Sequence, residues 1–262
     1  MEGNNIFSKI NKKKNFYILI ILILNLILIL NLENKKKYFY YKKITHKNKK
    51  KILKNDLIKI DKNLIFEKYK RNSVLYPLPK DIIFKPIMRK KEVIAFSYFM
   101  KPGNIYFEFG SGGSTNIASY YNVTTFSVES DIKWHRHLKK NNIKANYITF
   151  DLKAQKLGYP GKGTNIEDWK KYIQAYKKEY NADIILIDGR FRVACGLDIY
   201  NKIRNDTIVL IHNYIYRKEY KILENYYLKL KRWNTLAAFI KKPGINIIPD
   251  HIYQKYLTIS KL

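Results

Sequence analysis

The chain has 262 residues, which is enough for one ordinary domain with additional segments. Aromatic residues make up 15% of it, so a full apolar core can form and a wholly disordered chain is excluded. The formal net charge of +30 normally indicates nucleic acid or an anionic membrane as partner. Cys195 is the only cysteine, which excludes an internal disulfide.

The distribution of this charge argues against nucleic acid. Residues 1–91 hold 24 of the 51 basic residues and only six of the 21 acidic ones. The basic excess is therefore densest at the start of the chain, and Lys, Asn, Ile and Tyr are frequent throughout, as in proteins from genomes rich in A and T. We therefore do not expect nucleic acid as partner; the basic region is either a solvated stem or a surface that lies against the anionic headgroups of a lipid bilayer.

Residues 16–32, FYILIILILNLILILNL, form an almost wholly apolar run at the short end of a membrane-spanning helix. A cleavable signal peptide is the main alternative, but lysines follow the run where a small-residue cleavage site would stand. We expect a single-pass anchor over 16–32, after a basic tail (1–15) and before a lysine-rich stem (33–80) and a domain (81–262). More lysines follow the span than precede it, which favours a cytosolic domain.

The domain alternates between helical and strand patterns, which predicts an α/β fold. Expected helices cover 92–100, from 114 or 115 to about 120, a stretch around 134–138, 169–180 and 220–230. Expected strands cover 105–109, 124–128, 145–150, 183–188, 207–211 and 236–240. Glycines and a proline between Leu157 and Thr164 predict a flexible loop over the site.

A glycine turn follows the first expected strand. Gly110, Gly112 and Gly113 let backbone approach a ligand without a Cβ in the way. Glu129 stands at the carboxyl end of the next strand, and ligands of open parallel sheets bind beyond these ends. A carboxylate there suits two ribose hydroxyls, so the pattern predicts a nucleoside-containing cofactor. The dinucleotide fingerprint fits less well, because Thr115 stands where its third glycine should be.

The pattern Glu108-x-Gly110-x-Gly112-x-Ser114 resembles motif I of the class I S-adenosylmethionine-dependent methyltransferases, and Glu129 resembles their ribose-binding acid. The resemblance implies a Rossmann-like, doubly wound, mostly parallel seven-stranded sheet with helices on both faces. It also implies S-adenosylmethionine as cofactor, held by these five residues. An acid near the third strand's end often contacts the adenine amino group in this family, which points to Asp151. Only six strands are expected from the patterns above, so the seventh, an edge strand, would lie in the tail after Pro243.

A second block narrows the resemblance. LIDGRFRVACGL and the later IHNY are similar to LIDGRFRVACAL and HDY of a group of small, poorly characterised methyltransferase-like proteins. This likeness spans roughly Tyr106 to Ile240. The chain departs from it at Asn213, where the usual Asp is absent, which weighs against a carboxylate-dependent step or a metal site at that position.

The ends of the fourth and fifth expected strands carry the candidate chemistry. Methyl transfer needs orientation and, for a hydroxyl acceptor, a base; Asp188 and His212 are the candidates. Arg190 and Arg192 suit a carboxylate or phosphate of the substrate. Alternatively, one of them pairs with Asp188 or Glu129 to hold the site together. We expect no metal, because the donor set is thin for Mg²⁺.

These patterns favour a membrane-anchored methyltransferase acting on a glycan-like or small acceptor. Two alternatives stay open. Glu129-Ser130-Asp131 weakly resembles the acid-x-acid metal motif of nucleotide-sugar-dependent glycosyltransferases, some of which have a single-span anchor and a stem. The departure at Asn213 also fits a non-catalytic membrane protein that kept the fold.

Overall fold

The computed structural model describes residues 82–245 and 247–259. The tail, the anchor and the stem predicted from the sequence all lie outside the described residues. Within the described part of the chain, no helix is both long enough and apolar enough to cross a membrane.

A seven-stranded sheet organises the domain, in the order β3-β2-β1-β4-β5-β7-β6. The first five strands in sequence are parallel, whereas β7 runs antiparallel between β5 and β6. The mostly parallel seven-stranded sheet is therefore confirmed. The antiparallel β7 also separates it from the dinucleotide-binding order 3-2-1-4-5-6. The strands are β1 Ile105–Phe109, β2 Thr124–Glu129, β3 Asn146–Thr149, β4 Ile184–Ile187, β5 Ile208–Ile211, β6 Tyr227–Trp233 and β7 Leu236–Lys241.

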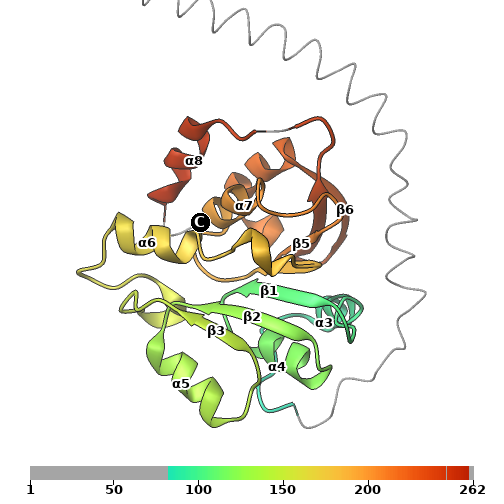
Figure 1. Ribbon diagram of the computed structural model, residues 1–262, viewed down its shortest axis with the longest axis vertical. Helices are drawn as coiled ribbons and strands as arrows, with labels where there is room; N and C mark the ends of the chain where they lie inside the picture. The colour runs from blue at the N-terminus through green and yellow to red at the C-terminus, as the bar shows by residue number, and fades with distance from the viewer. Residues whose placement is uncertain (1–81, 246, 260–262) are drawn as a thin grey trace, which may run out of the picture. The chain divides into compact units, whose positions relative to one another are not determined.

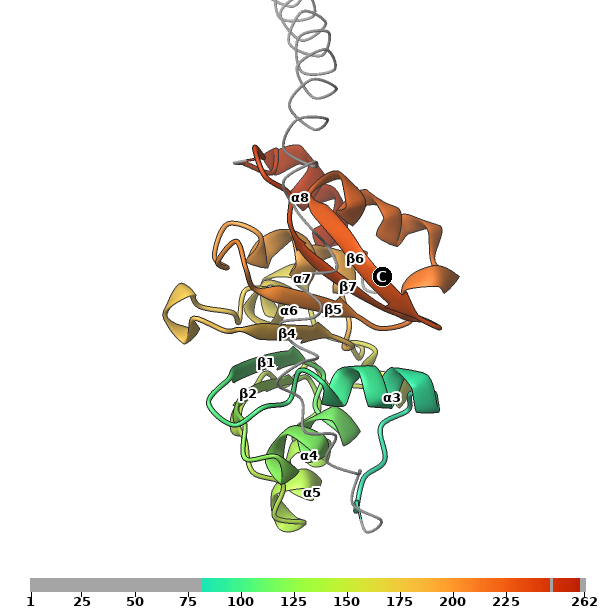
Figure 2. The ribbon, with the colours of Figure 1, turned by 90° about the vertical axis from the view of Figure 1, so that its right-hand side faces the viewer.

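Both faces of the central sheet are covered. Every residue of β4 and β5 is buried, and successive side chains of a strand point to opposite faces, so protein packs on both sides. In both views α4 and α5 lie beside β1–β3, and α6, α7 and α8 gather in a separate group (Figures 1 and 2). The helices are α3 Lys90–Ser97, α4 Gly113–Tyr120, α5 Ile132–Lys140, α6 Ile166–Ile173, α7 Arg192–Ile199 and α8 Asp250–Leu257.

Two predictions for the last third of the chain are wrong. The expected helix over 220–230 is instead a 3₁₀ helix, Lys218–Asn225, followed by β6. This strand buries Tyr227 and Leu228 and turns Lys231 and Arg232 to solvent. The missing edge strand is therefore β6 and not the tail after Pro243, which contains α8. The apolar residues of this region fit both a helical and a strand period, and pairing with β7 decides for the strand.

The order in which strands are added to the sheet reverses at β1. β2 and β3 lie on one side of β1, and β4 and the later strands lie on the other. At this point hydrogen bonds join the carboxyl ends of neighbouring strands. Gly110 N–H, after β1, donates to Val128 O of β2 (2.8 Å), and Asp188 N–H, after β4, donates to Phe109 O of β1 (3.0 Å). Such a reversal opens a crevice beyond the carboxyl ends of the strands.

Candidate functional site

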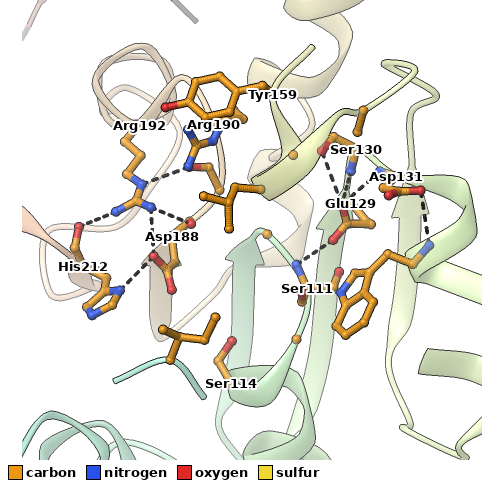
Figure 3. A pocket seen from close by; sticks show the side chains of 18 of the residues that line it. Ser111, Ser114, Glu129, Ser130, Asp131, Tyr159, Asp188, Arg190, Arg192 and His212 are labelled. Atoms are coloured by element: carbon orange, nitrogen blue, oxygen red, sulfur yellow. Dashed lines mark hydrogen bonds and ion pairs between the residues drawn. The ribbon is translucent and has the colours of Figure 1, made fainter. Parts of the chain in front are cut away.

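A pocket of about 840 Å³ fills this crevice. It is lined by the turns after β1, β2, β4 and β5, by residues 86–88 and by the loop over 154–159. Of the loop expected over the site, Leu157 to Thr164, only residues 157–159 line the pocket. Figure 3 shows Glu129 and Ser111 on one side of the pocket and Asp188, Arg192 and His212 on the other. The volume lies in the range of pockets that bury small-molecule ligands.

The glycine turn after β1 is packed against backbone on two sides. Gly110 has a φ of +94°, and a Cβ built on it would lie 2.8 Å from the Cα of Gly189. A Cβ on Gly113 would lie 2.2 Å from the nitrogen of Pro86. Gly112 differs, because a Cβ there would meet nothing within 4 Å although the residue lines the pocket. The bare backbone of Gly112 is therefore a surface that a ligand can approach.

Glu108 lies beneath this turn and not in the pocket lining. Its fully buried carboxylate accepts hydrogen bonds from the hydroxyls of Tyr106 (2.7 Å), Ser114 (2.6 Å), Ser127 (2.7 Å) and Thr115. Burial raises the pKa of Glu108, and the hydroxyl hydrogen bonds lower it by less. The structure thus places Glu108 where it ties the turn and α4 to β1 and β2. Ser114 contacts Glu108 and also lines the pocket.

Glu129 ends β2 inside the pocket. Its Oε2 accepts a hydrogen bond from Ser111 N–H (3.0 Å), and its Oε1 accepts from the N–H groups of Ser130 (2.6 Å) and Asp131 (2.9 Å). Burial raises the pKa of Glu129, which these backbone donors offset in part. The carboxylate is thereby held in one orientation next to the glycine turn, as expected for a group that accepts bonds from a ligand's hydroxyls.

Asp151 lies apart from these residues. It is exposed, its Oδ1 accepts a hydrogen bond from Lys153 N–H (2.9 Å), and it is not part of the pocket lining. The structure therefore gives no support to the expected adenine contact. β3 ends at Thr149, and the chain returns to the pocket only at Ala154.

Two carboxylates contact one imidazole here: Asp188 and His212 follow β4 and β5, and Glu92 lies on α3. His212 is buried; its Nδ1 lies 2.9 Å from Asp188 Oδ1 and its Nε2 lies 3.6 Å from Glu92 Oε2. Burial raises the pKa of Asp188, but the charge of Arg192 and the hydrogen bond and charge of His212 outweigh this and lower it. The bond to His212 and the ion pair to Arg192 both reach Oδ1, which leaves Oδ2 as the oxygen for a ligand.

Asp188 and His212, the two candidate catalytic residues, have different surroundings. Both ring nitrogens of His212 face carboxylates of the protein, whereas Asp188 keeps one oxygen that neither His212 nor Arg192 contacts. Glu92 is held in turn by the N–H of Arg89 (2.7 Å) and by the N–H and hydroxyl of Thr235 (2.6 Å each). These donors and His212 lower the pKa of Glu92, although burial, the largest single influence, raises it.

The side chain of Arg192 binds backbone carbonyl groups. It is nearly buried and donates to the carbonyl oxygens of Gly189 (2.9 Å), His212 (2.6 Å) and Asp188 (2.9 Å). The ion pair with Asp188 Oδ1 is 3.1 Å long. Of the two roles that the sequence left open for the arginines, the structure supports the one in which Arg192 holds the site together.

Arg190 is placed differently. Its guanidinium lies over the ring of Tyr159, 4.3 Å from the centroid, and both residues line the pocket with Arg217. Its Nε is buried without a hydrogen-bond partner among the described residues. Arg190 therefore remains a candidate for contact with a ligand.

In the part of the chain that the structure describes, no group of three or more His, Cys, Asp or Glu residues is placed to hold a metal ion. Asn213, at the position of departure from the family pattern, lines the pocket next to His212. It adopts a left-handed conformation (φ 58°), which Asn tolerates better than most residues.

No family model and no curated protein matches this chain. Among solved structures, it is similar to a methyltransferase-like protein from Silicibacter pomeroyi, with 25% identity, a TM-score of 0.60 and coverage of 67% of this chain and 97% of that one. The fold is that of the class I methyltransferases. The resemblance drawn from motif I is thus confirmed.

Two more distant similarities have TM-scores too low to bear on the argument. One is to a TehB-like SAM-dependent methyltransferase from Corynebacterium glutamicum (14% identity, TM-score 0.39, 56% of this chain and 86% of that one). The other is to a T. thermophilus 16S rRNA N2 G1207 methyltransferase in complex with AdoMet and guanosine (12%, 0.34, 59% and 39%).

Within this methyltransferase fold, sequence reasoning missed Glu92, which lies beside His212, and two residues that line the pocket, Tyr159 and Arg217. Glu92 lies on α3 and accepts a hydrogen bond from the N–H of Arg89, but an arginine before the helix lacks the Ser or Thr signature that would have pointed to this contact. Tyr159 and Arg217 lie on loops, where the sequence has no period to show which side chains face a site.

Proposed function

We propose that this protein is a membrane-anchored methyltransferase that uses S-adenosylmethionine. The observation that carries the proposal is the pairing of the bare glycine turn with Glu129. The Glu129 carboxylate accepts a hydrogen bond from Ser111 within that turn, at the edge of a pocket large enough for a nucleoside. The similarity to the Silicibacter methyltransferase-like protein supports it.

The residues present fit this cofactor. Gly110 and Gly112 offer backbone, Ser114 lies behind them, and Glu129 offers oxygens for two ribose hydroxyls. Trp134 adds an aromatic wall, with its Nε1–H bonded to Ser111 O (2.9 Å). When bound, S-adenosylmethionine supplies an electrophilic methyl group.

The acceptor would lie at the Asp188 end of the pocket. Asp188 Oδ2 can take a hydrogen bond from an acceptor hydroxyl or amine and fix its direction of attack. His212 keeps the other oxygen in place, and Glu92 keeps His212 in place. We propose a glycan-like or small molecule as acceptor, and not nucleic acid.

The anchoring part of the proposal depends on the apolar run over 16–32 alone. It places the protein in a membrane as a single-pass protein, with the domain on the cytosolic side by the lysine bias.

A glycosyltransferase is less well supported. Its acid-x-acid motif would need Glu129 and Asp131 free for a metal ion, but Asp131 Oδ1 accepts from Lys133 N–H (2.8 Å) and Trp134 N–H (3.2 Å) to cap α5. Glu129 is likewise engaged by backbone N–H groups.

Calorimetric titration of the full chain in mild detergent with S-adenosylhomocysteine tests the proposal. We expect binding by the wild type and by Glu167→Ala, an exposed carboxylate on α6, and at least tenfold weaker binding by Glu129→Ala. Ligand at about 100 times its dissociation constant should also stabilise the fold by roughly 2.7 kcal/mol.

A folded wild type that does not bind S-adenosylhomocysteine would overturn the proposal. Binding of a nucleoside diphosphate with Mn²⁺ would then favour the glycosyltransferase, and binding of neither would favour a non-catalytic protein.

A further inference from the structure

The Asp188 end of the pocket carries more positive than negative charge. Arg190, Arg192 and Arg217 line it, whereas Asp188 is the carboxylate that lines the turns after β4 and β5. Asp188 is already paired with Arg192 and His212. Arg192 donates to three backbone carbonyls, and Arg190 and Arg217 are the other arginines of the pocket lining.

Packing positions Arg190, which has no ion pair within the described residues. Its guanidinium lies on the face of Tyr159, and a Cβ built on Gly158 would lie 3.9 Å from its Cγ, so the loop over 154–159 rests on its stem. Its Nε is buried and lacks a hydrogen-bond partner among the described residues. Since this Nε is enclosed by protein, the terminal nitrogens of the guanidinium are the donors that would reach a ligand in the pocket.

Tyr159 brings Arg217 to the same place. Desolvation raises the pKa of the Tyr159 phenol, but the charges of Arg190 and Arg217 and their hydrogen bonds to it outweigh this and lower it. Two cations from different loops therefore converge on one hydroxyl at the pocket wall. The charge of Arg190 also reaches Asp188, where it contributes to the lowered pKa of that carboxyl.

We propose that Arg190, Arg217 and Tyr159 form an oxyanion site for a carboxylate or phosphate group carried by the methyl acceptor. The inference rests on the proposed function and names the class of its substrate. Guanidinium groups bind both oxyanions through paired hydrogen bonds, and the Tyr159 hydroxyl adds a third donor. An acceptor held this way would present its nucleophile to Asp188 Oδ2, with the anion fixing its orientation.

The carboxylate of the cofactor's amino acid part is the competing occupant of the same cluster. The cofactor end of the pocket lies at Ser111 and Glu129, whereas Arg190 follows β4. Separate measurement of anion binding and cofactor binding distinguishes the two occupants.

The experiment uses the full chain in mild detergent, with inorganic phosphate and acetate as probes, titrated calorimetrically with and without S-adenosylhomocysteine. The variants are Arg190→Gln and Arg217→Gln, with Arg136→Gln as control because Arg136 is exposed on α5 and does not line the pocket. Thermal unfolding verifies that each variant is folded. Tyr159→Phe is the milder second variant, should the arginine variants fail to fold.

We expect the wild type and Arg136→Gln to bind one of the probes, and Arg190→Gln and Arg217→Gln to bind it at least tenfold more weakly. Affinity for S-adenosylhomocysteine should stay within threefold in all four proteins. Preference for phosphate or for acetate then tells which oxyanion the acceptor carries.

Equal anion binding by all four folded proteins, or none by the wild type, would overturn the inference. A tenfold loss of S-adenosylhomocysteine binding in Arg190→Gln would also overturn it, because the guanidinium would then hold the cofactor. Arg190-dependent anion binding in a protein that does not bind S-adenosylhomocysteine would leave the oxyanion site standing and remove the methyltransferase proposal alone.

Discussion

A side chain on Gly110 would have to occupy the place of Gly189, since its Cβ would lie 2.8 Å from the Gly189 Cα. The turns after β1 and β4 are therefore in direct backbone contact at the point where the sheet reverses. A Cβ on Gly189 would in turn lie 2.0 Å from the Tyr172 hydroxyl. The turn that carries Ser111 and the turn that carries Asp188 share this junction, so a displacement of one turn displaces the other.

Gly110→Ala should destabilise the protein more than Gly103→Ala. Both glycines have positive φ, so each substitution costs about 1–2 kcal/mol in backbone strain. Only Gly110 adds a clash with backbone, which we expect to cost a further 1–3 kcal/mol or so. Urea unfolding of both variants measures the difference. Equal losses would mean that the two turns separate easily.

Glu108→Gln should change how stability depends on pH. The pKa of Glu108 is raised in the fold, so between its unfolded and folded values the native state binds more protons than the unfolded chain. The contribution of Glu108 to stability is therefore largest at low pH, and it falls as pH rises from about 4.5 through the folded pKa. The free energy of unfolding of the wild type minus that of the variant should decline over this window. Glu167→Gln on the exposed face of α6 is the control, and a difference that grows with pH would contradict the prediction.

Asp188→Asn should show the opposite sign. The pKa of Asp188 is lowered in the fold, mainly because Arg192 and His212 outweigh the effect of burial. Its contribution is therefore present above the unfolded pKa and is lost as pH falls below about 4. Wild type minus variant should increase from acid toward neutral pH in the same unfolding series. A flat difference would show that the Arg192 and His212 contacts do not favour the charged carboxylate.

Arg192→Lys should cost roughly 2–4 kcal/mol of stability although it keeps the charge, because an ammonium group cannot reach three backbone carbonyls in different directions. Arg136→Lys, on the exposed surface of α5, should change stability by less than about 0.5 kcal/mol. Urea midpoints provide the measurement. A small effect at Arg192 would mean that water replaces the lost donors.

Leu157→Gly should be more stable than Leu157→Ala by about 1 kcal/mol, because Leu157 has a φ of 62° that only glycine adopts without strain. The side chain is largely exposed, so little burial is lost in either variant. Thermal unfolding of the pair isolates the backbone term, and equal stability would indicate that the loop relaxes out of this conformation.

The sequence predicts the centre of the sheet well, because β4 and β5 are short, wholly apolar runs, and such runs are typical of strands buried on both faces. It also brings Asp188 and His212 to adjacent strand ends, in agreement with the 2.9 Å between them. Periodicity fails at β6, where the pairing partner β7 decides between helix and strand. The sequence also does not distinguish the roles of Arg192 and Arg190. The Arg192 guanidinium donates to three backbone carbonyls, whereas the Arg190 guanidinium lies on the face of Tyr159, and both contacts depend on the folded structure.

Glu92 shows a different limit. Its role depends on α3 meeting the turn before β7, where Thr235 donates to it. Nothing local in the sequence carries that contact, because it joins segments that are distant along the chain. Asp151 shows the opposite limit. It stands at the expected position in the sequence, but it lies on the loop after β3 and is exposed to solvent.

The segment that leads into α3 is part of the pocket wall. Pro86 lies against Gly113, Phe84 packs edge-on against Trp134, and Phe84 O accepts a bond from Asn116 Nδ2 (3.3 Å). Shortened forms of the protein made for crystallisation must therefore begin before Phe84. A boundary drawn at α3, the first regular element described, would yield a complete sheet with a damaged binding site, and a negative titration on such a fragment would say nothing about the native chain.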